Sequence, residues 1–226
     1  MTSSEIAGRI QHTNVRADAS QADIDRLLAE CVEFGFHGAM VNPVWVPLAS
    51  TAVRGSPVRV CTALDFPMGG GTTDAVTRAA AEAVRLGAQE IDVMTKVGWL
   101  KSGMESEYAA HLASVVAVVG RVPVKAMLEV ALLTPTELAR AVELCANAGV
   151  TYVKNSSGYG GGDASPAIVA QLVSLCGGRM RVKASGGIRT RELADALLEA
   201  GAELLGSSAS VGIVTGAAVP RDKGSY

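Results

Sequence analysis

The sequence has few of the residues that build metal sites or disulfide frameworks. It contains three histidines and four cysteines in 226 residues, and the cysteines, at positions 31, 61, 145 and 176, show no CxxC spacing. Zinc sites and small disulfide-bonded folds need clusters of these residues. We therefore expect no metal ion, and the unpaired cysteines favour a cytoplasmic location, where thiols stay reduced.

The sequence also lacks a strong net charge and a long apolar run. Lys and Arg number 20 against 22 Asp and Glu, a formal charge of -2, which attracts neither nucleic acid nor an anionic membrane surface. No apolar run approaches the roughly 18 residues that a membrane-spanning helix needs, and the N-terminus has no signal-peptide pattern. These absences predict a soluble protein whose partners are small molecules.

The chain does contain short apolar, β-branched runs that alternate with alanine-rich segments of helical period. Strands are predicted at 9–14, 37–42, 58–64, 90–95, 123–129, 151–155, 181–184 and 203–207, and helices at 23–33, 72–86, 105–119, 136–148, 166–175 and 191–199. Eight such units favour a (β/α)8 TIM barrel over a doubly wound open sheet, which more often has five or six strands. The sequence thus predicts one TIM-barrel domain over 1–226, with a short N-terminal lead and a flexible C-terminal tail over 215–226.

Helix boundaries are marked by capping residues and glycines. Thr134-Pro135-Thr136-Glu137 is typical of a helix start, with a hydroxyl to cap free amides and a carboxylate near the positive end of the dipole. Glycines that follow apolar periodic segments predict helix ends at positions 35, 87, 149 and 201.

Two lysines end neighbouring predicted strands, Lys154 after Tyr152-Val153 and Lys183 after Arg181-Val182. A TIM barrel gathers its active-site groups at the carboxyl ends of the strands, so these side chains should converge. Two ammonium groups about 5 Å apart repel by about 3 kcal/mol at an effective dielectric near 20, or about two pKa units. One amine should then be largely neutral near pH 7, as attack on a carbonyl requires. The residues alone leave open which lysine is the nucleophile, and a single lysine is more often a surface charge.

Other charged residues share these strand ends. Asp92, between apolar neighbours, is a candidate proton carrier or the partner of a lysine in a structural ion pair. Lys96 has the same strand parity, and we expect it to be a solvated lysine at the rim. Lys125 and Glu129 also share one parity and are expected to form an internal ion pair.

Glycines and hydroxyls follow the last two predicted strands, in Ser185-Gly186-Gly187-Ile188-Arg189 and in Gly206-Ser207-Ser208. TIM barrels often bind phosphate at these two loops, on backbone amides and a helix N-terminus. We therefore expect a phosphate group here. Arg189 either adds a positive charge or begins the next helix.

These motifs resemble those of the 2-deoxyribose-5-phosphate aldolase family along almost the whole chain. The resemblance rests on Val41-Asn42-Pro43, Val60-Cys61-Thr62, Phe66-Pro67-Met68-Gly69, Gly87-Ala88-Gln89-Glu90-Ile91-Asp92, Tyr152-Val153-Lys154, Ser157-Gly158 and Val182-Lys183-Ala184-Ser185-Gly186-Gly187-Ile188-Arg189-Thr190.

The resemblance implies an aldolase that forms a Schiff base at Lys154, with Lys183 lowering the pKa of Lys154 and Asp92 moving protons through a bound water. It implies no metal or organic cofactor, a phosphorylated sugar or aldehyde substrate, and a homodimer. It also places a set of residues around the substrate: Thr13 near the sugar end, and Gly158, Gly186, Gly187, Gly206 and Ser208, with Ser207 and Arg189 in the same loops, around the phosphate. Tyr226, the last residue, matches a tyrosine that some members use for proton transfer; a disordered tail is the alternative.

The chain departs from the family pattern near the predicted site. Gln11 stands for an aspartate, Asn155 for a threonine, Asp65 for a glycine and Lys96 for an asparagine, and Asp65 could compensate Lys96 as an ion pair. The departures keep open a Schiff-base aldolase with a different donor or acceptor aldehyde. A sugar-phosphate-binding barrel that has lost catalysis and a phosphate-binding isomerase barrel are further alternatives.

Overall fold

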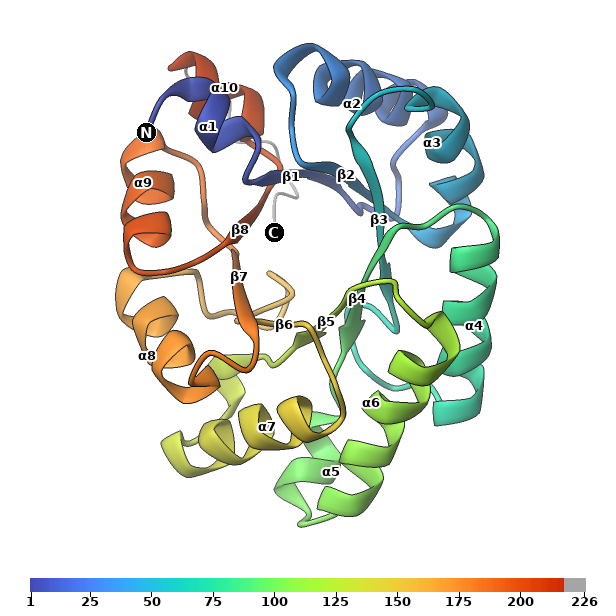
Figure 1. The fold of residues 1–226 in the computed structure, drawn as a ribbon, viewed down its shortest axis with the longest axis vertical. Helices are drawn as coiled ribbons and strands as arrows, with labels where there is room; N and C mark the ends of the chain where they lie inside the picture. The colour runs from blue at the N-terminus through green and yellow to red at the C-terminus, as the bar shows by residue number, and fades with distance from the viewer. Residues whose placement is uncertain (218–226) are drawn as a thin grey trace.

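The computed structural model describes residues 1–217, which form a closed barrel of parallel strands surrounded by helices (Figure 1). Consecutive strands pair in order from β1 to β8, and β8 pairs with β1 to close the ring. The strands are β1 (Ile10–Asn14), β2 (Gly38–Val41), β3 (Arg59–Leu64), β4 (Glu90–Met94), β5 (Val124–Met127), β6 (Tyr152–Lys154), β7 (Arg181–Ser185) and β8 (Leu204–Ser207). The predicted TIM barrel and its eight strands are confirmed.

The six predicted helices are also present, as α2 (Gln21–Phe34), α4 (Thr73–Arg85), α6 (Glu105–Val119), α7 (Pro135–Asn147), α8 (Pro166–Cys176) and α9 (Arg191–Glu199). Shorter helices were not predicted: α1 (Ser3–Ala7), α3 (Val46–Ala52), α5 (Val97–Lys101), α10 (Ser210–Thr215) and the 3-10 turns η1 (Pro43–Trp45) and η2 (Val130–Leu132). One or two turns are too short for a 3.6-residue period to emerge from the sequence.

The predicted C-terminal tail over 215–226 overlaps the structure's last helix by one residue, because Thr215 ends α10. This helix lies beside α1, so the two ends of the described chain meet on one side of the barrel (Figure 1). The remainder of the predicted tail, residues 218–226, lies outside the described residues.

The predicted helix boundaries follow from local capping. Thr134 and Glu137 form a capping box at the start of α7, in which each side chain accepts a hydrogen bond from the other residue's backbone amide. Gly35 ends α2 in the left-handed conformation at φ 68, which glycine adopts without steric cost. The helix start and the glycine stops are therefore confirmed where they were predicted.

The strands present alternate residues to two different environments, as a period of two requires. On β4, Ile91 and Val93 join the apolar layer between the barrel and its helices, whereas Glu90 and Asp92 are buried among polar groups in the lumen. A second, smaller apolar cluster also lies in the lumen, and we call it the lumen cluster: Val15, Met40, Cys61, Ala63, Met94 and Met127, with Phe66 packed against it. The barrel interior thus has a charged part and an apolar part.

Candidate active site

Three lysines surround one buried carboxylate in the lumen. The Nζ atoms of Lys183 and Lys154 lie 2.6 and 3.2 Å from Asp92 Oδ2, and that of Lys125 lies 3.2 Å from Asp92 Oδ1. Lys154 and Lys183 are register partners on β6 and β7, which is why their side chains meet. Their predicted convergence is confirmed, and Asp92 pairs with both of them.

This arrangement sets the protonation of the carboxylate and of the lysines around it. Burial alone raises the pKa of Asp92, but the three ammonium groups outweigh it and hold that pKa far below its usual range. Burial, together with the nearby Lys154 and Lys125 cations, lowers the pKa of Lys183 to about 8 against the attraction of Asp92. A lysine that can release its proton near neutral pH is therefore present.

Lys125 does not pair with Glu129, so that prediction is wrong. Its Nζ atom instead lies 2.6 Å from Glu90 Oε2, in addition to the contact with Asp92. Glu129 follows the end of β5 at φ 52, which breaks the alternation of the strand, and its carboxylate accepts a hydrogen bond from the Ser157 amide instead. The two anions raise the pKa of Lys125 despite its complete burial.

The charges continue down the barrel towards the amino ends of the strands. Glu90 accepts a hydrogen bond from Gln11 Nε2 at 2.7 Å, and its Oε1 atom lies 2.8 Å from His37 Nε2. His37 and Lys125 lower the pKa of Glu90 to about 2, although burial raises it. We call this chain of contacts, from Lys154 through Asp92, Lys125 and Glu90 to His37, the charge ladder.

Gln11, one of the four departures found in the sequence, is part of this network. Its amide donates to Glu90, and its Oε1 atom accepts a hydrogen bond from Lys183. A neutral acceptor therefore holds Lys183 where a second carboxylate would have stabilised its positive charge. Sequence reasoning missed the roles of Gln11 and Glu90, although Glu90 shares its strand parity with Asp92.

Lys154 lies at the boundary between the charged and the apolar parts of the lumen. Its Nζ atom is 3.4 Å from the sulfur of Met127, a member of the lumen cluster. The Lys154 side chain is 8% exposed, against 1% for Lys183. Of these two lysines, Lys154 has the more exposed side chain.

Lys96 is not the solvated rim lysine that the sequence suggested. Its side chain is buried and forms an ion pair with Asp65, so the predicted compensation between these two departures is confirmed. Asn155, another departure, joins β6 to β7, because its side chain accepts from the Ser185 amide at 2.8 Å and donates to the Ser185 carbonyl at 2.9 Å.

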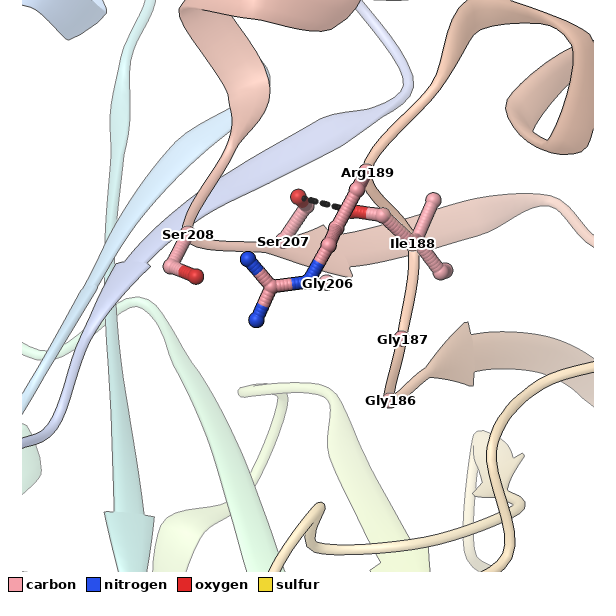
Figure 2. A pocket seen from close by; sticks show the side chains of 7 residues that line it. All are labelled: Gly186, Gly187, Ile188, Arg189, Gly206, Ser207 and Ser208. Atoms are coloured by element: carbon pink, nitrogen blue, oxygen red, sulfur yellow. Dashed lines mark hydrogen bonds between the residues drawn. The ribbon is translucent and has the colours of Figure 1, made fainter. Parts of the chain in front are cut away.

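A small pocket opens between the loops that follow β7 and β8 (Figure 2). Six predicted phosphate-site residues line it together with Ile188: Gly186, Gly187, Arg189, Gly206, Ser207 and Ser208. Figure 2 shows the Arg189 side chain extending from the β7–α9 loop into this space. The Ser207 hydroxyl donates to the Ile188 carbonyl at 2.7 Å and so ties the two loops together.

The other predicted binding residues lie outside the lining of this pocket. Gly158 follows β6 at φ 90, and its amide donates to Ser156 Oγ at 2.9 Å. The Thr13 hydroxyl, on β1, donates to the Gln11 carbonyl at 2.8 Å. Tyr226 lies outside the described residues.

Asp163 is a neighbour of the pocket that sequence reasoning missed. A Cβ atom added to Gly187 would meet the Asp163 carboxyl carbon at 2.7 Å, and one added to Gly186 would meet Asp163 Oδ1 at 3.6 Å. The carboxylate therefore lies against the glycine pair. Its place directly after the run Gly160-Gly161-Gly162 was the available signal.

The described residues provide neither a metal site nor a membrane-spanning helix. Within residues 1–217, no group of three or more His, Cys, Asp and Glu side chains could hold a metal ion. In the same part of the chain, no helix is long and apolar enough to cross a membrane.

Comparisons with known proteins agree with this geometry, although no family model matches the chain. A deoxyribose-phosphate aldolase from Geobacillus sp. (strain WCH70) is 40% identical over 212 residues, which cover 93% of this chain and 95% of the relative. A Coccidioides immitis structure proposed to be a deoxyribose-phosphate aldolase superposes with a TM-score of 0.93 at 35% identity, over 96% of this chain and 86% of its own. The tetrameric deoxyribose phosphate aldolase from Aeropyrum pernix gives a TM-score of 0.88 at 28% identity, over 94% and 91% of the two chains. On this similarity, which spans nearly the full length of the relatives, the protein belongs to the deoxyribose-phosphate aldolase family.

Proposed function

We propose that the protein is a class I aldolase that reversibly cleaves 2-deoxyribose 5-phosphate to glyceraldehyde 3-phosphate and acetaldehyde through a Schiff base on Lys154. The observation that carries the proposal is the pair of lysine amines on Asp92 Oδ2, at 2.6 and 3.2 Å. Imine chemistry needs a neutral amine beside groups that move protons, and this arrangement supplies both. Membership of the family supports the choice of substrate.

Accessibility supports Lys154 rather than Lys183 as the nucleophile. Lys183 is enclosed by Asp92 and Gln11, and its side chain is 1% exposed. Lys154 faces the lumen cluster and has the more open side chain. An aldehyde must reach the attacking nitrogen, so Lys154 forms the covalent bond and Lys183 acts beside it.

The reaction begins when the neutral Lys154 amine adds to the C1 aldehyde of the open-chain sugar, and loss of water leaves a protonated imine. The C2–C3 bond then breaks and its electron pair moves to the iminium nitrogen, which produces an enamine. At the same time the C3 hydroxyl loses its proton and becomes the aldehyde of glyceraldehyde 3-phosphate. Protonation of the enamine carbon and hydrolysis release acetaldehyde and restore Lys154.

Asp92 and Lys183 divide the proton transfers. Asp92 stays ionised at neutral pH because of its low pKa, so it accepts hydrogen bonds and orients a water rather than donating a proton of its own. Lys183, with a pKa of about 8, can hold a proton or give it up near neutral pH. We assign Lys183 as the proton store and Asp92 Oδ2, which both amines contact, as the bridge to Lys154.

The pocket between the β7–α9 and β8–α10 loops would receive the phosphate of the substrate. Gly186, Gly187 and Gly206 expose backbone there, and Arg189 supplies a positive charge. The predicted contacts of Thr13, Gly158 and Ser208 with the sugar phosphate belong to the same proposal.

Intact-mass analysis after borohydride reduction tests the proposal. The protein is incubated with deoxyribose 5-phosphate or with acetaldehyde, reduced, and mapped by peptide digestion. We expect an adduct on Lys154 with both compounds, its loss in Lys154→Leu, and its retention in the control Lys101→Leu, since Lys101 pairs with Glu137 on the outer helices. An adduct with acetaldehyde alone would indicate a different acceptor aldehyde, and no adduct from either compound would rule out the Schiff-base mechanism.

We also propose that the protein is a homodimer of the cytoplasm. The tetrameric A. pernix structure is an example of association within the family, and the four cysteines are free and buried, as a reducing compartment allows. Light scattering of the purified protein tests the dimer, and the mass of a tetramer would contradict it.

A further inference from the structure

A second ion pair lies at the carboxyl end of the barrel, outside the catalytic group. It joins Asp65, directly after β3, to Lys96, close after β4. Their side chains are only 9% and 4% exposed. Removing both charges from water costs free energy, so the contacts of the two side chains must compensate for their burial.

All three protons of the Lys96 ammonium have acceptors in one segment, residues 65–72, which we call the β3–α4 loop. They are Asp65 Oδ2, the Gly69 carbonyl at 2.9 Å and the Gly71 carbonyl at 2.6 Å. Asp65 Oδ1 in turn accepts the Gly71 amide at 2.7 Å. The loop is therefore folded around this amine and takes its shape from it.

The backbone of the loop depends on the same pair. Asp65 has φ 57, a left-handed conformation in which a side chain is normally disfavoured. Where Gly69 approaches β4, an added Cβ atom would lie 2.8 Å from the Thr95 carbonyl. The loop thus sits directly on the end of β4, in a conformation that the ion pair stabilises.

Phe66, the next residue, connects this loop to the candidate active site. Its ring packs against the lumen cluster, whose member Met127 contacts the Lys154 amine through its sulfur at 3.4 Å. On another side it meets the Tyr159 ring edge to face, with centroids 5.3 Å apart. Phe66 is therefore linked to Lys154 through the apolar side chains of the lumen cluster.

We propose that Asp65 and Lys96 are positioning residues that fix Phe66 and thereby set the size of the donor aldehyde accepted at Lys154. The inference rests on the proposed function. The carbon that becomes the enamine lies next to the imine carbon, so a donor larger than acetaldehyde brings its extra methyl group towards the lumen cluster, against which Phe66 packs. A firmly held ring excludes that methyl group, whereas a loosened ring admits it.

Donor selectivity in the synthetic direction tests the inference. The ratio of kcat/KM for acetaldehyde to that for propanal is measured with glyceraldehyde 3-phosphate in wild type, Lys96→Met, Asp65→Asn and the double variant Asp65→Gly/Lys96→Asn. Since one methylene in a fitted apolar pocket gives about 10- to 200-fold discrimination, we expect the ratio to fall at least about fivefold in each single variant, mainly through KM. The double variant removes the pair without leaving an unpaired charge, and its ratio should fall as in the single variants because nothing then holds the loop.

Two further measurements separate positioning from general stability. Amide exchange of the loop should quicken in Lys96→Met and stay at the wild-type rate in Lys101→Met, which removes the more exposed Lys101–Glu137 pair. Lys96→Arg keeps the positive charge but replaces the compact ammonium group by a planar guanidinium. This variant should fold, and its kcat/KM ratio of acetaldehyde to propanal should fall less than that of Lys96→Met. Thermal unfolding of each variant is recorded alongside.

The outcomes distinguish this inference from the proposed function. An unchanged ratio in active Lys96→Met or Lys96→Arg overturns the inference alone, whatever the loss of thermal stability. Absence of any Lys154 adduct in the wild type overturns the proposed function, and the inference with it.

Discussion

Lys154 and Lys183 share one oxygen of Asp92, which lies 3.2 and 2.6 Å from their Nζ atoms. The single negative charge of Asp92 cannot balance two ammonium charges. One of the two lysines therefore holds its proton weakly. Burial and the neighbouring cations lower the pKa of Lys183 to about 8. The barrel thus brings an amine and its proton reservoir within reach of a single carboxylate.

Replacing Asp92 by asparagine keeps the shape of the side chain and removes the charge that three lysines contact. Because positioned proton transfer contributes about 100- to 10,000-fold, we expect kcat to fall at least about 100-fold in Asp92→Asn. Borohydride trapping on Lys154 should remain detectable but slow. Steady-state turnover checks this, and a kcat close to that of the wild type would remove Asp92 from the proton path.

The pH dependence of adduct formation should depend on Lys183. In the wild type the rate should rise with pH to a midpoint near pH 8, because loss of one proton from the lysine pair yields a neutral amine. Lys183→Met removes both the like charge next to Lys154 and the group that can take its proton, so the midpoint should move to higher pH. Trapping rates between pH 6 and 10 measure it, and a midpoint that stays or falls contradicts the argument.

Arg189 should act only on phosphorylated substrates. Charge-assisted hydrogen bonds are worth about 1.5–3 kcal/mol, so Arg189→Met should raise KM for deoxyribose 5-phosphate at least about tenfold. The KM for unphosphorylated deoxyribose should not change. Arg191→Met is the matched control, since Arg191 pairs with Asp195 at 2.8 Å on α9 and does not line the pocket. Equal effects on the two substrates would place the phosphate elsewhere.

Asp163 should have the opposite effect to Arg189. Its carboxylate lies against Gly186 and Gly187 and repels a phosphate bound at these glycines. At the dielectric of a partly exposed site, such repulsion corresponds to about a two- to fivefold decrease of KM for the phosphorylated sugar in Asp163→Asn. Unphosphorylated deoxyribose serves as the control, and an increase of KM would instead show that Asp163 supports the loop.

Acid stability should depend on Glu90, whose pKa of about 2 in the folded protein lies below its ordinary value of 4.5. Between these two values the unfolded chain binds the proton first, so the free energy of unfolding is full above pH 4.5 and falls as the pH drops towards 2. The shift corresponds to about 3 kcal/mol. Urea unfolding at pH 7, 4 and 3 should therefore show a steeper loss in wild type than in Glu90→Gln, and parallel losses would contradict the assignment.

The fold was predictable because the strands, which are covered on both faces, are short apolar runs, and the helices between them show a helical period. The convergence of Lys154 and Lys183 followed from equivalent positions on neighbouring strands, and the register confirms it. Capping residues such as Thr134 gave the helix starts. These features depend on contacts between residues that are near in sequence or that recur at a regular spacing. Such contacts can be predicted from a sequence pattern.

The wrong predictions concern side-chain partners that do not follow from the alternation of residues along a strand. Lys125 and Glu129 share a parity, but the chain leaves the strand before Glu129, and the left-handed backbone there turns its side chain away from Lys125. Lys96 similarly lies beyond β4, where a loop from the preceding unit folds over it. Partners that depend on loop conformation require the three-dimensional structure.

The charge ladder reaches His37 and Arg59, at the end of the barrel remote from the pocket, where the Arg59 Nε atom lies 3.5 Å from Glu90 Oε1. Ion pairs link the members of the ladder one after another from His37 to Lys154, and none of these members lines the pocket. Substitutions of His37 and Arg59 therefore give directed evolution a way to change the charges of the lysine network from the opposite end of the barrel, at residues that do not line the pocket.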